Sequence, residues 1–350
     1  MGSKISSFGK TADGKEVSLI TLVNKNGMGI EVTNYGATLV AVTVADRDGR
    51  IDDVVLGYDD VTDYTLHGGY LGATVGRNCN RIHGAKVAID GKEYILDDNE
   101  NGNNLHSGFH GYNSLLWDFE VIEEELAVKF THHSADGEQG FPGNFDITVT
   151  YTLTEENEVK IHYCGTSDKD TIANLTNHSY FNLGGHGSGG ILEHTMWIDS
   201  DAITVTDARS IPTGEIRDIK GSPMDFNTPK KIGKDISADY DQLIQGAGYD
   251  HNYVLKNQGC GLRKIAEAAD EKSGRVMEVL TDSVGVQLYT GNFIDKDSRG
   301  KGGAVYQPRH GFCLETQYYP DANHHENFPS SILKAGERYD TTTVYKFRVK

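Results

Sequence analysis

Hydrophobic and polar residues alternate along much of the chain, in short segments rich in β-branched and aromatic side chains. The clearest segments are residues 29–46, 145–154, 158–167 and 344–350. Alternation with a period of two is typical of strands that bury one face. Glycine-containing turn dipeptides such as Asp-Gly and Asn-Gly recur between these segments. The pattern predicts an all-β fold, a large and mostly antiparallel β-sandwich or barrel with few short helices.

Helical periodicity is weak and is strongest in residues 262–274. Because Lys-Ser-Gly and a new alternating run follow there, we expect a hairpin rather than a helix. The acidic triplet within residues 121–130 is interpreted as a solvated turn between two strands. No Pro-rich, Ser-rich or highly charged linker divides the chain, so we predict one domain over residues 1–350.

Composition narrows the classes of partner. The 350 residues carry 33 basic and 51 acidic side chains and a formal net charge of −18, which disfavours binding to nucleic acid or to anionic membranes. The four cysteines are widely spaced and form no metal-binding motif, and no apolar run of about 18 residues is present. We therefore expect a cytoplasmic protein without a nucleic-acid or membrane partner.

The segment "GRNCNRIHG" (76–84) concentrates polar side chains after a predicted strand. Arg77, Asn78, Asn80 and Arg81 would form a cluster of hydrogen-bond donors suited to hydroxyl groups of a sugar. The alternative is a glycine-flanked loop with a surface arginine. The segment alone leaves both interpretations open.

Histidines in the chain do not form a convincing metal motif. His106 and His110 are four residues apart, but Ser-Gly between them argues against a helix that would present both to one ion. The pairs His132-His133 and His324-His325 would point to opposite faces of a strand. We therefore predict no metal site.

Buried polar residues mark two further segments. In "NLTNHSYFNLGG" (174–185), His178 stands between an amide and a hydroxyl, and a structural role and a catalytic role are both open for it. In "GFCLETQYYPDANHHENFP" (311–329), alternation places Phe312 and Leu314 on one face and Glu315 on the other. A buried carboxylate needs a partner or a task. Asp250 and Gln287 also interrupt apolar alternation, although structural hydrogen bonds would explain each of these two residues alone.

Taken together and in order, these segments resemble the galactose mutarotase (aldose 1-epimerase) family. The resemblance runs over nearly the whole chain and includes "NYGATLVAVTVADRDGRIDDVVLGYDDVTDY", "GATVGRNCNRI", "NLHSGFHGYNSLLWD", "NLTNHSYFNLGG", "YDHNYVL", "VGVQLYTGNF" and "GFCLETQYYPDA". It implies a large β-sandwich and a cofactor-independent isomerase that interconverts the α and β anomers of free hexoses such as galactose and glucose by acid/base ring opening and closure.

The resemblance also implies roles for individual residues. His178 matches the general acid, Glu315 the general base and His106 a second active-site histidine. Asn177 and Ser179 would line the mouth of the site or brace His178. The other residues that match sugar ligands are Asn80, Arg81, Asp250 and Gln287.

Two further expectations concern the details of such a site. A carboxylate near His178, either Glu315 or Asp250, would raise the protonated fraction of the imidazole. Ser107 stands where the family usually has glycine and could narrow the site beside His106. We expect a monomer or a weak homodimer.

Three alternatives remain open at this level. A glycosidase would usually need two carboxylates that flank the scissile bond, a sugar-binding protein on the same fold would need no acid and base, and a sugar-phosphate epimerase would need additional cationic residues. The preference for galactose or glucose also stays open. No dinucleotide-binding, nucleophile-elbow or P-loop motif is present, which agrees with the absence of a cofactor or nucleophile from the expected chemistry.

Overall fold

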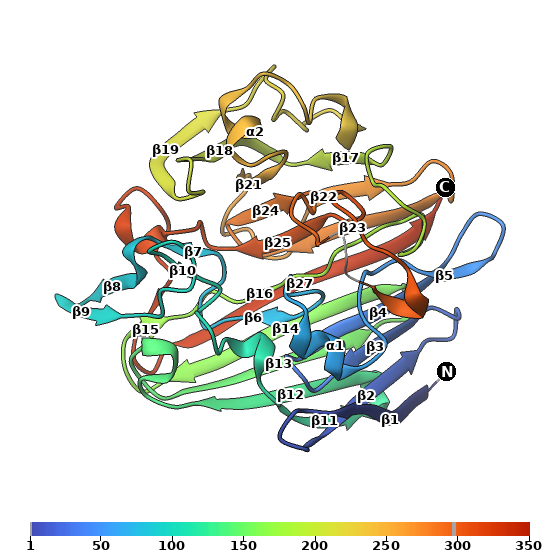
Figure 1. The fold of residues 1–350 in the computed structure, drawn as a ribbon, viewed down its shortest axis with the longest axis horizontal. Helices are drawn as coiled ribbons and strands as arrows, with labels where there is room; N and C mark the ends of the chain where they lie inside the picture. Colours follow the sequence, from blue (N-terminus) through green and yellow to red (C-terminus); the bar gives the residue numbers. More distant parts are fainter. Residues whose placement is uncertain (1, 296–298) are drawn as a thin grey trace.

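Antiparallel strands dominate the protein, as the alternation predicts. The structure, a computed structural model, describes residues 2–295 and 299–350. Its largest sheet has nine strands, in the spatial order β11 (Asp118–Ile122), β12 (Ala127–Ser134), β13 (Phe145–Leu153), β14 (Glu158–Ser167), β27 (Arg338–Val349), β23 (Arg275–Thr281), β22 (Arg263–Ala269), β17 (Thr195–Ile198) and β20 (Lys230–Lys231) (Figure 1).

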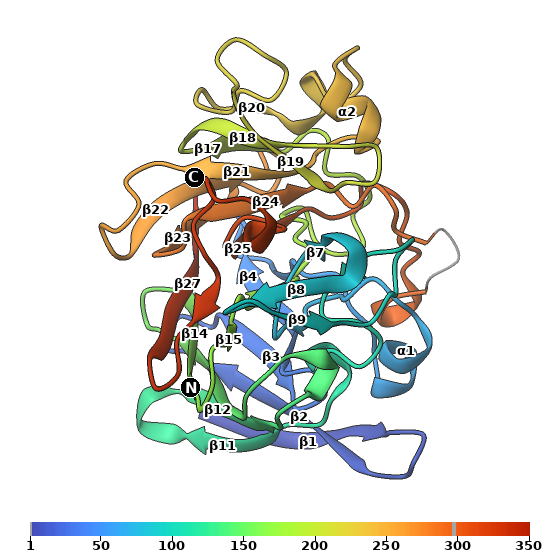
Figure 2. The ribbon, with the colours of Figure 1, turned by 90° about the vertical axis from the view of Figure 1, so that its left-hand side faces the viewer.

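Two five-stranded sheets accompany it. The first runs in chain order through β1 (Gly2–Lys10), β2 (Glu16–Val23), β3 (Gly29–Thr33), β4 (Thr38–Ala45) and β5 (Ile51–Asp53). The second has the order β19 (Pro212–Asp218), β18 (Ser200–Thr206), β21 (Asp250–Leu255), β24 (Gly285–Tyr289) and β25 (Cys313–Gln317). Figure 2 shows β1, β2 and β11 at one end of the molecule and β18 and β19 at the other.

Packing explains why the alternating segments became strands. In β13, alternate residues from Phe145 to Leu153 are buried, while the residues between them are at least partly exposed. The largest apolar cluster contains buried residues from Ile20 in the first sheet to Phe347 in the last strand, so distant parts of the chain share this core. The prediction of one domain stays a prediction.

Local predictions are also confirmed. Residues 262–274 form no helix: β22 pairs with β23 as a hairpin, with Ala269 opposite Val276. The acidic triplet Glu123–Glu125 forms a short exposed turn between β11 and β12. Among the described residues, the α-helices are α1 (Val61–Leu66) and α2 (Asp241–Gln245), and neither is long enough to cross a membrane.

In the part of the chain that the structure describes, four pairs of short strands form separate small sheets, and polar motifs lie on or beside the first two of these pairs. They are β6 (Thr74–Val75) with β16 (Thr176–Asn177), β7 (Arg81–Ile82) with β10 (Asn104–Leu105), β8 (Lys86–Ile89) with β9 (Lys92–Ile95), and β15 (Thr171–Ile172) with β26 (Ile332–Leu333). Because β16 lies against β25, the motif around residue 178 faces the motif around residue 315.

Candidate active site

The register of the second five-stranded sheet builds one wall of the site. Gln287 in β24 lies opposite Glu315 in β25, and Asp250 in β21 lies opposite Tyr289 in β24. Residues two apart in a strand point to the same face, so this register gathers all four polar side chains on one side of the sheet. The other face carries Leu288 and Leu314 into the apolar core.

Short strands and the turns beside them supply the opposite wall. His178 follows β16, and its backbone is fixed by hydrogen bonds from its N–H to Ala73 O and from Gly72 N–H to its own carbonyl. Arg81 begins β7, with Asn80 just before it, and His106 follows β10. The pairing of β7 with β10 sets Leu105 opposite Arg81, which brings the Arg81 and His106 motifs together.

These walls enclose a cavity of about 540 Å³, large enough for a small-molecule ligand. Six of the nine predicted site residues line it, and they are His106, His178, Glu315, Asn80, Arg81 and Asp250. Residues that the sequence reasoning did not select also line it, among them Tyr70, Glu100, Tyr180, Arg209, Tyr289 and Phe293.

The other three predicted residues lie behind the cavity wall. The Gln287 amide donates a hydrogen bond to Asp250 Oδ1 at 2.8 Å, so it orients a cavity residue. Asn177 donates to Gly72 O at 2.8 Å and accepts from Ser179 N–H at 3.2 Å. Both Asn177 and Ser179 are buried, and their position supports the expectation that they brace His178 rather than contact a ligand at the mouth.

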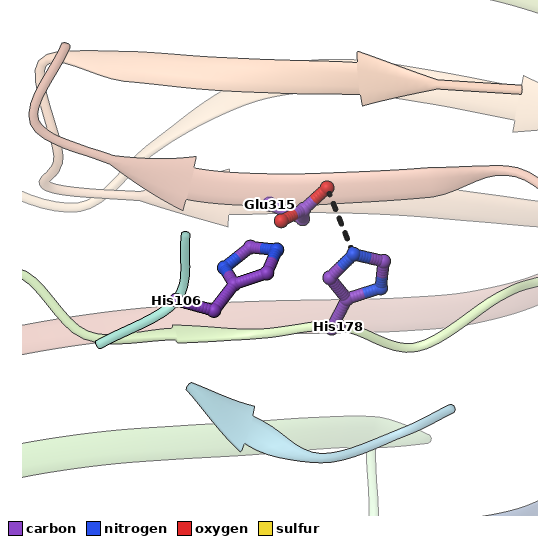
Figure 3. A group of neighbouring side chains, drawn as sticks. All are labelled: His106, His178 and Glu315. Carbon is purple, nitrogen blue, oxygen red and sulfur yellow. Dashed lines mark ion pairs between the residues drawn. The ribbon is translucent and has the colours of Figure 1, made fainter. Parts of the chain in front are cut away.

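His178 and Glu315 form the central pair of the site. Nε2 of His178 lies 3.6 Å from Oε1 of Glu315, and the two side chains are 6% and 3% exposed. Figure 3 shows His178, from the segment that follows β16, approaching Glu315 of β25. The other carboxylate oxygen, Oε2, is buried without a hydrogen-bond partner among the described residues. An unsatisfied buried oxygen of this kind favours binding of a donor.

The protonation state of His106 follows from its hydrogen bonds. Asn80 N–H donates to His106 Nδ1 at 3.0 Å, so Nδ1 is an acceptor and the neutral ring carries its proton on Nε2. Burial, with smaller effects from His178 and Arg81, lowers the pKa of His106 well below 6.5 and keeps the ring neutral. His106 can therefore offer an N–H donor at Nε2.

Burial also controls the two central groups. It lowers the pKa of His178 to about 4, and burial together with the charge of Asp250 raises the pKa of Glu315 well above 4.5. The prediction that a neighbouring carboxylate would raise the protonated fraction of His178 is therefore wrong, because the pKa of His178 is lowered. Removal from water disfavours the charged form of His178, and it disfavours the charged form of Glu315 more than the positive charge of Arg81 favours it.

The polar side chains of residues 76–84 separate into two roles. Arg77 is fully buried, and its guanidinium donates to Pro142 O at 2.8 Å and to Ser134 Oγ at 2.6 Å, so it is a structural residue. Ser107 does not narrow the cavity, because its hydroxyl donates to Asn78 O at 2.9 Å and accepts from Asn78 N–H at 2.8 Å. Asn80 and Arg81 are the members of this segment that line the cavity.

One group of side chains in the described part of the chain has metal-ligand character. Ligand atoms of His106, His178 and Glu315 all lie within 4.8 Å of one another. A zinc ion bound by two histidines and a carboxylate lies about 2.0–2.2 Å from each ligand atom. Ligand atoms 4.8 Å apart would therefore have to move closer together before one ion could bind them all. His110 is exposed and does not line the cavity, and the absence of a metal from the reaction stays a prediction.

Comparison with known proteins places the chain in a family. Residues 18–346 match the family model of aldose 1-epimerase. Galactose mutarotase of Bos taurus is 43% identical over 320 residues, which are 91% of each chain, and aldose 1-epimerase of Escherichia coli K12 is 34% identical over 96% of each. The crystal structure of a GalM/aldose epimerase homologue from C. elegans superimposes with a TM-score of 0.87 at 29% identity, covering 95% of this chain and 99% of that one.

An all-β fold with a buried histidine and glutamate at a polar cavity thus defines the class of protein. The chain belongs to the aldose 1-epimerase family, as its sequence motifs indicate.

Proposed function

We propose that the protein is an aldose 1-epimerase that interconverts the α and β anomers of free hexoses, such as galactose and glucose, without a cofactor. The observation that carries this proposal is the pairing of His178 Nε2 with Glu315 Oε1 at 3.6 Å on the wall of a polar cavity. Family membership and relatives named galactose mutarotase and aldose 1-epimerase support it.

Ring opening needs two proton transfers at neighbouring atoms. Glu315 accepts the proton of the C1 hydroxyl while the bond from C1 to the ring oxygen O5 breaks, and His178 donates a proton to O5. Both oxygens are bonded to C1, so the acid and base must lie close together, as this pair does. Rotation about C1–C2 and reversal of the transfers then give the other anomer.

The proton inventory of the pair reconciles these roles with burial. A neutral His178 beside a protonated Glu315 holds the same number of protons as imidazolium beside carboxylate. The two forms differ only in which group holds the proton, so their ratio does not change with pH. A bound sugar offers a hydroxyl donor to Glu315 and an acceptor to His178, which favours the reactive ion-paired form.

The remaining cavity residues fix the sugar. The Nε2–H of His106 can donate to a sugar oxygen on which negative charge develops during ring opening. Arg81 and Asn80 can donate to hydroxyl groups of the sugar. The Asp250 carboxyl, held by Gln287, can accept a hydrogen bond from a further hydroxyl. Pre-aligned donors and acceptors of this kind stabilise charge that develops in the transition state.

Polarimetry tests the proposal directly. Freshly dissolved α-D-galactose should lose its excess rotation faster with the protein than without it, and prior treatment with EDTA should leave the rate unchanged. Release of nitrophenol from a nitrophenyl galactoside would favour a glycosidase instead. Binding of galactose without any change in the rate of anomerisation would favour a sugar-binding protein.

A further inference from the structure

Glu100 lies on the cavity wall and is bound to Arg81 through both of its carboxylate oxygens. Oε2 accepts from Arg81 Nε at 2.6 Å and Oε1 accepts from Arg81 Nη2 at 2.7 Å. The two side chains are 24% and 16% exposed. This two-point geometry is the one that arginine uses to bind carboxylate and phosphate groups.

The backbone around Arg81 is fixed independently of Glu100. Its N–H donates to Asn80 Oδ1 at 2.8 Å, and its carbonyl accepts from Asp321 N–H at 3.0 Å. Glu100 therefore controls the direction of the side chain rather than the course of the chain. Two of the five guanidinium N–H groups are engaged, and three remain for other acceptors.

The pairing changes the charge that a ligand meets. Among the described residues that line the cavity, the arginines are Arg81 and Arg209, and the acidic residues are Glu100, Asp250 and Glu315. Arg209 is half-exposed, and its Nη2 lies 3.5 Å from Oδ2 of Asp207. Because Glu100 neutralises Arg81, which is partly buried, an anionic ligand finds no unpaired arginine in the interior of the cavity among these residues.

We propose that Glu100 is a specificity-determining residue that restricts the cavity to uncharged sugars. It occupies the two Arg81 donors that would otherwise bind a carboxylate or phosphate group, and it turns the remaining donors toward hydroxyl oxygens. This inference rests on the proposed function of the site, because it concerns the choice among sugars.

Glu100→Gln tests the inference with little change in size. The substitution removes the charge and leaves only one acceptor oxygen for Arg81. We expect inorganic phosphate, titrated calorimetrically in a phosphate-free buffer, to bind this variant at least about tenfold more tightly than the native protein. Phosphate should also inhibit galactose anomerisation by this variant competitively. In the same variant, kcat/KM for galacturonate should rise relative to kcat/KM for galactose.

Matched variants separate the causes. Glu93→Gln removes the same charge from the preceding strand, where Glu93 lies 3.0 Å from Lys86 outside the cavity, and should leave phosphate binding unchanged. Adding Arg81→Gln to Glu100→Gln should abolish the gain. Glu100→Ala gives a second test if the glutamine variant does not fold.

Phosphate binding is measured without turnover, so the two proposals fail separately. Absence of galactose anomerisation in the native protein would contradict the proposed function alone. Equal phosphate affinity in the native protein and in folded Glu100 variants would overturn the role of Glu100. A gain that persists in the Arg81 double variant would overturn it as well.

Discussion

Replacing Glu315 with glutamine should separate catalysis from folding. The variant keeps the size of the side chain and one carbonyl oxygen that can accept a hydrogen bond, but at neutral pH it cannot accept a proton. Positioned general acids and bases contribute about 10²–10⁴-fold to a rate, so kcat should fall by that factor. The loss corresponds to about 2.7–5.4 kcal/mol of activation free energy.

The free energy of unfolding of the Glu315→Gln variant should rise or stay the same, although its kcat falls. Burial and the charge of Asp250 raise the pKa of Glu315 above its usual value, so the folded protein binds this proton more tightly than the unfolded chain. Its contribution to stability is therefore present at low pH and is lost as pH rises through the raised pKa. Every tenfold difference in proton affinity is worth about 1.4 kcal/mol. Because glutamine does not titrate, the Glu315→Gln variant does not lose this stability as pH rises.

The assay combines polarimetry on fresh α-D-galactose with urea unfolding at pH 5 and pH 8. Glu124→Gln, in the exposed turn Glu123–Glu125, is the matched control and should change neither quantity. KM should stay within about threefold, because the proton transfer to Glu315 occurs in the transition state and its loss leaves ground-state binding of the sugar largely unchanged. A Glu315→Gln enzyme with native kcat would falsify the assignment of the base. A marked loss of stability at pH 8 would refute the argument from burial.

Three further outcomes are expected. His178→Asn should lower kcat by about 10²–10⁴-fold with a much smaller effect on KM, because the transferred proton matters in the transition state; a change confined to KM would make His178 only a sugar ligand. The pH profile should be bell-shaped, with a lower limb near 4, where His178 binds a second proton for the pair, and an upper limb where Glu315 loses the last one; a lower limb at 6.5 would indicate that the pair is exposed to water. Arg77→Met should destabilise the protein by roughly 3–5 kcal/mol in urea unfolding, because buried acceptors lose their partner, whereas native stability in that variant would contradict the structural role.

Strand alternation made much of the fold and of the central pair predictable. Glu315 stands in a regular strand, so a period of two is enough to place it on the other face of the sheet from Phe312 and Leu314. The hairpin of β22 and β23 was predictable for the same reason, since turn residues separate two alternating runs. In such segments the face of each side chain follows from its position.

In irregular segments, the direction of each side chain could not be predicted from the sequence. Asn80 has a φ of 60°, in the left-handed region, so the alternation between Arg77 and Arg81 is interrupted and the sequence could not tell which arginine enters the cavity. Glu100 stands in a loop of polar residues with no periodicity. The lowered pKa of His178 depends on burial by neighbours from several strands, which only the assembled fold defines.

The position of β27 has a consequence for biosynthesis. Residues 338–349 lie between β14 and β23 in the middle of the nine-stranded sheet, although they are translated after the other eight strands of that sheet. Until they emerge from the ribosome, β14 is paired only with β13 and β23 only with β22, and the unpaired edge of each strand promotes aggregation. A nascent chain therefore holds both His178 and Glu315 before its central sheet can form, and a chaperone that covers exposed strand edges would act in that interval.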